Sequence, residues 1–175
     1  HGSGGTLLAE ALKGTKVNVE LLHSDVNPGF EGTRPEPLPQ YLPLLREKMK
    51  KGKYDLGLVL DGDADRIAAV LPGGDFLSPQ KILALLALHL WKNRGIKGGI
   101  VKTICGTAMI DNMARANGIP LYQTPVGFKY ISDLMLTKDL IAVGEEAGGM
   151  GLPNYIPERD GILSGLLLLE MMVYE

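Results

Sequence analysis

Three aspartates at alternating positions are the residues whose types and spacing are best suited to chemistry. Asp61, Asp63 and Asp65 alternate with two small residues and are followed at once by Arg66, a stretch called the acid loop below. The preceding residues, 56–60, are mostly aliphatic and predict a buried strand of a parallel or mixed sheet. In open α/β sheets, ligands bind beyond the carboxyl ends of the strands. The acid loop is therefore expected where such a sheet carries its chemistry.

The spacing of the aspartates limits what they can bind. In an extended chain, alternate side chains lie roughly 6.6 Å apart along one face, whereas Mg²⁺ holds its oxygens at about 2.0–2.1 Å. The chain must therefore curl after Leu60 if the three carboxylates share one ion. Without a cation, carboxylates packed this tightly repel one another. We predict a Mg²⁺ site at Asp61, Asp63 and Asp65; an acidic surface turn is the alternative, because Asp and Gly are common in turns.

Two other motifs with alternating acids fit the acid loop poorly. A calcium-binding loop counted from Asp61 needs Gly at its sixth and Glu at its twelfth position, where this sequence has Arg66 and Pro72. A strand followed by Asp-x-Asp also resembles the aspartyl-phosphate hydrolases of the haloacid dehalogenase type. Those usually continue with Thr or Val where Asp65 stands here. A metal-dependent phosphatase with Asp61 as its nucleophile is kept as an alternative.

A second loop with polar chemistry follows another short aliphatic strand, expected at 140–143. Residues 144–151 read Gly-Glu-Glu-Ala-Gly-Gly-Met-Gly, a stretch called the glycine loop below. Glycines let the backbone and a carboxylate approach a polar ligand closely. A carboxylate such as that of Glu145 can accept hydrogen bonds from sugar hydroxyls. A glycine-rich surface loop with a solvated acid pair is the alternative.

The rest of the chain predicts the scaffold that positions the two loops. Strands alternate with helices, which is typical of an α/β fold. We expect two consecutive α/β domains, 1–76 and 77–175, with mixed, largely parallel sheets flanked by helices. Ser78, Thr124 and Asp160 are the expected N-caps of the helices that follow them. Strands are expected at 17–22, 56–60, 67–71, 99–103, 119–123 and 140–143, and helices from 7 onward and over 41–51, 78–94, 107–117, 126–136 and 161–173.

Composition and charge exclude several classes of partner. Eighteen basic and twenty acidic residues give a formal charge of −2, with no sign of a nucleic-acid or membrane-surface patch. The longest aliphatic run, around 82–91, is too short to span a bilayer, and His89 within it is expected to pack rather than bind a ligand. The single cysteine, Cys105, excludes an internal disulfide and suits a reducing compartment, so we expect a cytoplasmic protein.

Several segments together resemble one family, the α-D-phosphohexomutases, which include phosphoglucomutase and phosphomannomutase. The string Asp-Gly-Asp-Ala-Asp-Arg of the acid loop is similar to the family's magnesium loop. The resemblance implies most of the second domain and all of the third domain of a four-domain enzyme. The other matching segments follow the family's order: His-Gly-Ser-Gly at 1–4, Pro-Glu-Pro at 35–37, Thr-Pro-Val-Gly-Phe-Lys at 124–129, Gly-Glu-Glu-Ala-Gly at 144–148 and Arg-Asp-Gly at 159–161.

The resemblance implies roles for residues around the substrate. Arg66 is expected to contact a phosphate beside the magnesium ion. Glu145 falls on the family's sugar-binding acid, and Gly127 belongs to the same expected sugar site. Ala147 stands where the family normally has Ser, so that one hydroxyl-to-hydroxyl bond with the sugar is missing.

Two basic residues complete the expected site. Lys129 either meets a phosphate or lies on a solvated face. Arg159 stands where some family members have a Lys proposed for acid–base work. Because arginine stays protonated, we assign Arg159 to phosphate or transition-state binding rather than to proton transfer.

The activity implied by the resemblance is reversible transfer of a phosphoryl group between the 1- and 6-positions of a hexose phosphate, with glucose favoured by analogy. It uses a phosphoserine, a bisphosphorylated sugar and Mg²⁺. The sequence begins at His1 rather than Met and contains neither a Ser-His pair like that of the family's phosphoserine segment nor a counterpart of its fourth domain. We expect a fragment that is inactive alone, works with the missing domains of the same enzyme, and has an incomplete sheet. A non-catalytic module that binds metal or sugar phosphate is the last alternative.

Overall fold

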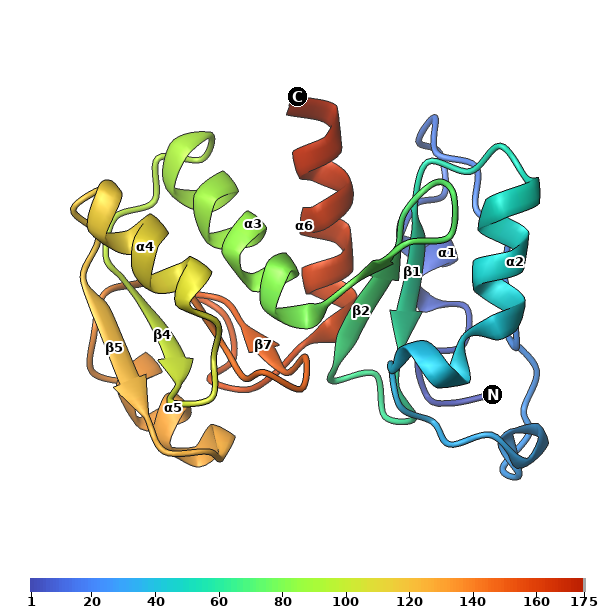
Figure 1. Ribbon diagram of the computed structural model, residues 1–175, viewed down its shortest axis with the longest axis horizontal. Coiled ribbons are helices and arrows are strands. Elements are labelled where there is room, and N and C mark those ends of the chain that lie inside the picture. The colour runs from blue at the N-terminus through green and yellow to red at the C-terminus, as the bar shows by residue number, and fades with distance from the viewer. Residues whose placement is uncertain (175) are drawn as a thin grey trace.

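The computed structural model describes residues 1–174 and consists of two sheets separated by helices (Figure 1). One sheet is built from residues within 57–77 and the other from residues within 99–151. Helix α6, Gly161–Tyr174, stands between the two sheets in Figure 1 although it comes last in the chain. No helix in this part of the chain is both long enough and apolar enough to cross a membrane.

The first sheet has three antiparallel strands in the order β1-β2-β3. Leu60 at the end of β1 pairs with Ile67 at the start of β2, so the acid loop is the hairpin connection between them. The sequence predicted a strand of a parallel or mixed sheet here, but all the pairings are antiparallel. Parallel neighbours need a crossover of about a dozen residues or more, and the acid loop is much shorter. The strands are β1 Gly57–Leu60, β2 Ile67–Val70 and β3 Phe76–Leu77, with helices α1 Leu7–Ala11 and α2 Pro43–Lys51 and 3₁₀ turns η1 Phe30–Gly32 and η2 Pro39–Tyr41.

The segment 17–22 forms no strand, so that prediction is wrong. A cavity of about 360 Å³ is lined by this segment and by residues 56–61, among others. The segment therefore has no strand beside it to exchange backbone hydrogen bonds, and Val17, Val19 and Leu21 stay exposed. Among the described residues β1 pairs with β2 alone, which leaves the edge of the first sheet open toward the cavity.

The second sheet has four strands in the order β5-β4-β6-β7. The first three are parallel and β7 joins β6 antiparallel, which confirms the predicted α/β class with a mixed, largely parallel sheet. Helices α4 and α5 lie in the connections that join the parallel strands. The elements are α3 Pro79–Lys92, β4 Gly99–Thr103, α4 Ala108–Ala116, β5 Leu121–Thr124, α5 Phe128–Met135, β6 Leu140–Gly144 and β7 Met150–Gly151.

One continuous hydrophobic core joins the two sheets. It contains Ile67 of β2 together with residues of α3, β6 and α6, such as Leu86, Ile141 and Leu168. Helix α6 packs on α3 and also on β1 and β2. Its approach to the first sheet is close at Gly165, where an added Cβ would lie 3.1 Å from Ile67 Cδ1. Residues on both sides of the expected domain boundary are therefore buried together.

The expected N-caps of the helices are confirmed only in part. Asp160 accepts a hydrogen bond from the backbone N–H of Leu163 at 2.8 Å and caps α6 as predicted. Ser78 occupies the residue before α3, without a side-chain bond to the helix. Thr124 is not an N-cap, because it ends β5 and α5 begins only after Gly127. Gly127 has φ 125°, a conformation that favours glycine and sets the start of the helix.

His89 packs inside the helical layer, as predicted. It is only 2% exposed. Its Nε2 lies 3.3 Å from Glu170 Oε1 and its Nδ1 lies 3.0 Å from Asn93 Nδ2. The ring also meets Tyr174 edge-on, with 5.3 Å between ring centroids. These contacts account for a buried polar ring without any ligand.

Candidate functional site

The β1–β2 hairpin gathers the three aspartates of the acid loop. One carboxylate oxygen from each of Asp61, Asp63 and Asp65 lies within 4.8 Å of the others. The chain curls as predicted, since Ala64 has φ 63°, a left-handed conformation uncommon for residues with a side chain. Asp61 is buried, Asp65 is half-buried and Asp63 is exposed, so the cluster runs from the interior to the surface.

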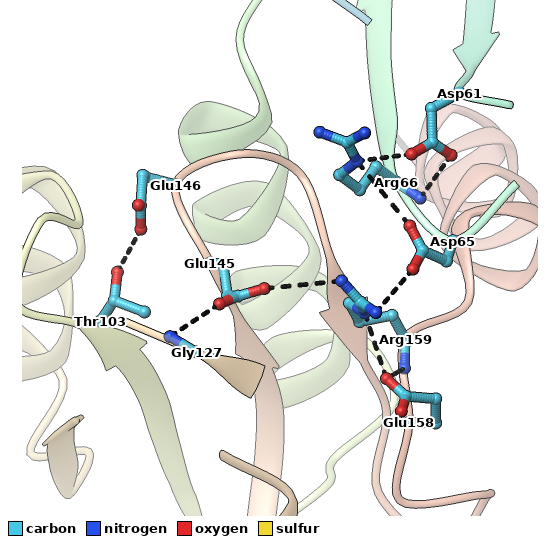
Figure 2. Close-up of polar contacts among 9 residues, drawn as sticks. All are labelled: Asp61, Asp65, Arg66, Thr103, Gly127, Glu145, Glu146, Glu158 and Arg159. Carbon is cyan, nitrogen blue, oxygen red and sulfur yellow. Dashed lines mark hydrogen bonds and ion pairs between the residues drawn. The ribbon is translucent and has the colours of Figure 1, made fainter. Parts of the chain in front are cut away.

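Arg66 holds the buried end of this cluster. Its backbone N–H donates to Asp61 Oδ1 at 3.1 Å, and its Nε donates to Asp61 Oδ2. Nε also lies 3.8 Å from Asp65 Oδ1. Figure 2 shows the two terminal nitrogens of Arg66 pointing away from the Asp61 carboxylate. Arg66 therefore fixes Asp61 through Nε while its terminal nitrogens face the space beside the acid loop.

Backbone hydrogen bonds join the acid loop to the glycine loop. Arg66 and Gly149 form an isolated antiparallel bridge. The N–H of Ile67 donates to Gly148 O at 3.1 Å. Gly148 has φ 108°, and a Cβ there would lie 2.8 Å from Ile67 O. The glycines thus allow a main-chain contact that fixes the two loops relative to each other.

Gly161 brings the start of α6 against the acid loop. Its N–H donates to Ala64 O at 3.1 Å. A Cβ at this position would lie 2.8 Å from the carbonyl oxygens of both Ala64 and Arg66. That separation is too short for a real contact, and both oxygens belong to the backbone. The close approach therefore requires glycine directly after the capping residue of α6.

Arg159 lies between the two loops (Figure 2). Its Nη2 is 2.8 Å from Asp65 Oδ2, and its Nη1 is 4.0 Å from Glu145 Oε2. Its Nε contacts Glu158 Oε1 at 3.1 Å, and the guanidinium carbon lies 5.5 Å from the centroid of the Phe128 ring. One cation therefore links a carboxylate of the acid loop to a carboxylate of the glycine loop.

Glu145 is the acid of the glycine loop that points toward this cation. The N–H of Gly127 donates to Glu145 Oε1 at 3.1 Å, which joins the glycine loop to the start of α5. Burial raises the pKa of Glu145 above its ordinary value, while the Gly127 hydrogen bond and the charge of Arg159 act in the opposite direction. The carboxylate is therefore partly desolvated, and a polar ligand can still reach it.

The pKa of Asp65 is also raised, again chiefly by burial. The neighbouring charges of Asp61 and Asp63 add to this effect, and the charge of Arg159 opposes it. The three carboxylates thus lie close together in a partly buried position, where their negative charges repel one another. A bound cation relieves this repulsion.

Two of the predicted site residues do not join this constellation. Lys129 is exposed, and its Nζ lies 4.8 Å from the centroid of the Tyr130 ring. That contact agrees with the alternative of a solvated face. Ala147 is exposed on the glycine loop, and its methyl group provides no hydrogen bond.

Two polar residues beside the site were missed in the sequence. Thr103 is fully buried at the end of β4 and donates from its hydroxyl to Glu146 Oε2 at 2.5 Å (Figure 2). Thr124 is buried at the end of β5, and its Oγ1 has no hydrogen-bond partner within residues 1–174. Their position at the carboxyl ends of parallel strands, where ligands bind in such sheets, is the signal that could have identified them.

The donor set of the acid loop fits a hard divalent cation. Mg²⁺ prefers oxygen ligands and is usually held by one or two carboxylates together with water and substrate phosphates. Three carboxylates opposed by the guanidiniums of Arg66 and Arg159 leave one net negative charge. A phosphate would be repelled by that charge alone, and a divalent cation would reverse its sign. The arrangement can therefore bind a phosphate once a cation is present, with a sugar-binding acid nearby.

Two family models match this chain over almost its whole length. Residues 1–74 match the model described as phosphoglucomutase/phosphomannomutase, alpha/beta/alpha domain II. Residues 78–175 match the corresponding model for domain III. The acid loop lies in the first match, and the glycine loop and Arg159 lie in the second.

Individual relatives agree with these models. Phosphoglucomutase-1 of Dictyostelium discoideum is 30% identical over 158 residues, which are 88% of this chain and 27% of the relative. Phosphoglucosamine mutase of Corynebacterium jeikeium is 30% identical and covers 98% of this chain and 38% of the relative. This chain thus spans well under half the length of these proteins.

A solved structure shows the same architecture. A protein of Thermus thermophilus assigned as a phosphomannomutase superposes with a TM-score of 0.94 at 38% identity, covering 98% of this chain and 40% of that one. The motifs, the fold and both family models lead to one conclusion. The chain belongs to the phosphoglucomutase/phosphomannomutase family of α-D-phosphohexomutases.

Proposed function

We propose that this chain is the metal- and sugar-binding part of a Mg²⁺-dependent phosphohexomutase. The whole enzyme interconverts a hexose 1-phosphate and a hexose 6-phosphate, with glucose as the first candidate, through a phosphoserine and a bisphosphorylated sugar. The observation that carries the proposal is the position of Arg159 between Asp65 and Glu145. Such an enzyme needs a cation site and a sugar site within reach of one substrate, and this geometry supports both.

The proposed ligands of Mg²⁺ are Asp61, Asp63 and Asp65, whose oxygens already lie together. When bound, Mg²⁺ supplies positive charge that stabilises a transferring phosphoryl group. Arg66 anchors Asp61 through Nε. Its terminal nitrogens, which point away from that carboxylate in Figure 2, can donate to a phosphate oxygen.

The proposed sugar site is formed by Glu145, with Gly127 holding one of its oxygens. A carboxylate accepts hydrogen bonds from two neighbouring hydroxyls without donating any, which suits a hexose. Arg159 stays protonated, so its part is to bind phosphate and steady developing negative charge rather than to move a proton. Ala147 provides no hydroxyl at the position where relatives are expected to have one, and Lys129 is left outside this proposal.

Calorimetry on the isolated chain tests the ligand sites. Glucose 1-phosphate should bind in the presence of Mg²⁺ and much more weakly without it. Glu145→Ala should weaken this binding about 10- to 100-fold, because a hydrogen bond to a charged group is worth about 1.5–3 kcal/mol. Glu47→Ala is the matched control, since Glu47 lies on α2 and pairs with Lys51. Equal affinity in wild type and Glu145→Ala would contradict the sugar site.

A coupled assay tests the proposed dependence on other domains. The isolated chain should give no conversion of glucose 1-phosphate to glucose 6-phosphate, because the family's phosphoserine segment is not among its 175 residues. Turnover above the background of a buffer control would refute this part. The calorimetric result is independent of it, so binding without turnover is the expected pair of outcomes.

The phosphatase alternative is less well supported by the geometry. The side chain of Asp61 is 0% exposed, and both of its oxygens accept hydrogen bonds from Arg66. An oxygen that accepts one hydrogen bond keeps a second lone pair for a metal ion, whereas a nucleophile needs an open oxygen facing the phosphorus atom. Beryllofluoride, which mimics an aspartyl phosphate, should therefore leave Asp61 unmodified. Trapping of an adduct on Asp61 by mass spectrometry or fluorine NMR would favour the phosphatase instead.

A further inference from the structure

A second group of metal-binding side chains lies outside the acid loop. His1, His23 and Glu31 each place one donor atom within 4.8 Å of the other two. His1 Nε2 is 2.8 Å from His23 Nδ1 and 3.6 Å from Glu31 Oε1. His23 Nδ1 is 3.7 Å from Glu31 Oε2. Two imidazole nitrogens and a carboxylate therefore lie close together.

These separations match the edges of a tetrahedral zinc site. Zinc binds nitrogen and oxygen ligands at about 2.0–2.2 Å, so neighbouring ligands of a tetrahedral ion lie roughly 3.3–3.5 Å apart. The two imidazole nitrogens lie 2.8 Å apart, His1 Nε2 lies 3.6 Å from Glu31 Oε1, and His23 Nδ1 lies 3.7 Å from the other oxygen, Oε2, so each pair is near that value.

Asp25 orients the most buried of the three ligands. Its Oδ1 lies 3.1 Å from His1 Nδ1, and the side chain of His1 is only 5% exposed. With Nδ1 donating to a carboxylate, the Nε2 of His1 carries the free lone pair and faces His23. A carboxylate behind a histidine is the usual second partner of a zinc-binding imidazole.

The backbone also holds the ligands in place. His23 has φ 54° and Glu31 has φ 53°, two of the few residues other than glycine in the left-handed region. Such strained conformations persist where surrounding contacts impose them.

We propose that His1, His23 and Glu31 bind a Zn²⁺ ion, with Asp25 as the positioning residue of His1. The imidazole nitrogens select a borderline-soft transition metal over Mg²⁺, which prefers an all-oxygen site such as the acid loop. His23 coordinates through Nδ1 when its proton resides on Nε2, and this tautomer is accessible because the His23 side chain is 43% exposed. Water completes the four-coordinate shell.

The position of this site links it to the acid loop. The N–H of Ser3 donates to Gly62 O at 2.9 Å, and the N–H of Gly62 donates to Pro35 O at 3.1 Å. The segments that carry the proposed zinc ligands therefore lead directly to Ser3 and Pro35, the two residues whose backbones hydrogen-bond to Gly62 of the acid loop. A zinc ion would link residues 1, 23 and 31 and so stabilise the two backbone hydrogen bonds to Gly62.

Zinc titration of the untagged chain in excess Mg²⁺ tests the proposal, because Mg²⁺ keeps the acid loop occupied. One zinc ion per chain is expected. His23→Ala and Glu31→Gln should each weaken zinc binding at least 10-fold, and Asp25→Asn should weaken it about 10- to 100-fold, as expected for the partner of a ligating histidine. Glu47→Gln on α2, an exposed carboxylate that pairs with Lys51, is the matched control and should leave zinc affinity unchanged. Zinc affinity undiminished in His23→Ala would overturn the proposal.

Histidine ring NMR of the wild-type chain gives a readout that does not depend on whether a variant folds. The sequence has three histidines. Zinc should shift the ring nitrogens of His1 and His23, whereas those of His89, buried against Glu170, should stay in place. No zinc-dependent shift at His1 and His23 would mean that their 2.8 Å contact is only a hydrogen bond between imidazoles, and the proposal would be wrong.

Discussion

Arg159 Nη2 lies 2.8 Å from Asp65 Oδ2, and this ion pair connects the segment before α6 to the hairpin of the other sheet. Each partner is less than one-third exposed. The same guanidinium faces Glu145. One side chain therefore contributes to the charge balance of both loops.

Replacing Arg159 by methionine should destabilise the chain. Arg159→Met keeps most of the aliphatic stem but removes the nearest cation from two partly buried carboxylates, those of Asp65 and Glu145. Loss of a fully buried partner costs about 3–5 kcal/mol, and partial exposure should reduce this to about 1–2 kcal/mol. Urea unfolding in metal-free buffer measures the change. Arg115→Met on the exposed side of α4 is the control and should stay within about 0.5 kcal/mol of wild type; an equal effect of both variants would contradict the prediction.

The start of α6 should tolerate no side chain at Gly161. In Gly161→Ala the new Cβ would meet two backbone carbonyl oxygens at 2.8 Å. Relief requires α6 to move away from the acid loop, and overpacking of this kind typically costs about 1–3 kcal/mol. Chemical denaturation gives the stability, and Mg²⁺ titration should show weaker binding in the same variant. Gly29→Ala, where the nearest atom is 3.4 Å away, should be close to neutral.

The carboxyl of Glu145 should make stability depend on pH in a defined direction. Burial raises its pKa above the ordinary 4.5. Between 4.5 and the raised pKa the folded chain binds more protons than the unfolded chain, so stability falls as the pH rises through that window. Glu145→Gln removes this penalty. Its unfolding free energy relative to wild type should therefore increase between about pH 4 and pH 7, and a difference that is constant with pH would count against the burial of this group.

Replacing the buried threonines Thr103 and Thr124 by valine should change the free energy of unfolding in opposite directions. Thr103→Val removes a hydroxyl that donates to Glu146 and should cost about 1–3 kcal/mol. Thr124→Val removes a hydroxyl that has no partner among residues 1–174 and should be neutral or stabilising. The two variants are matched in size and burial, so thermal or urea unfolding compares them directly. A larger loss in Thr124→Val would show that this hydroxyl has a partner of its own.

Local sequence patterns predicted the helices and strands whose own residues show a clear hydrophobic pattern. The aliphatic run before the acid loop and the amphipathic stretches over α2 and α4 became strand and helices at nearly the expected residues. The two-residue strands Phe76–Leu77 and Met150–Gly151 are too short for any periodicity and exist only because a neighbour pairs with them. Residues 17–22 show the reverse case, since their alternation is strand-like but no partner strand lies beside them.

The site was predictable to the extent that its residues are close in sequence. Asp61, Asp63 and Asp65 form a local motif, and their convergence followed from the need to curl. The contacts of Arg159 with Asp65 and of Gly127 with Glu145 join segments far apart in the chain. Only the family resemblance placed them together, because no local pattern encodes which loops meet across a fold.

The core that α6 shares with both sheets determines how the molecule comes apart. Leu168 of α6 and Ile67 of β2 belong to the same buried cluster as Ile141 of β6. If one sheet unfolded alone, the other sheet would lose part of the hydrophobic core that covers it, and apolar side chains would be exposed to water. Heat or denaturant should therefore melt residues 1–174 in one cooperative transition rather than two, and a protease cut near residue 75 should yield no half that is autonomously stable.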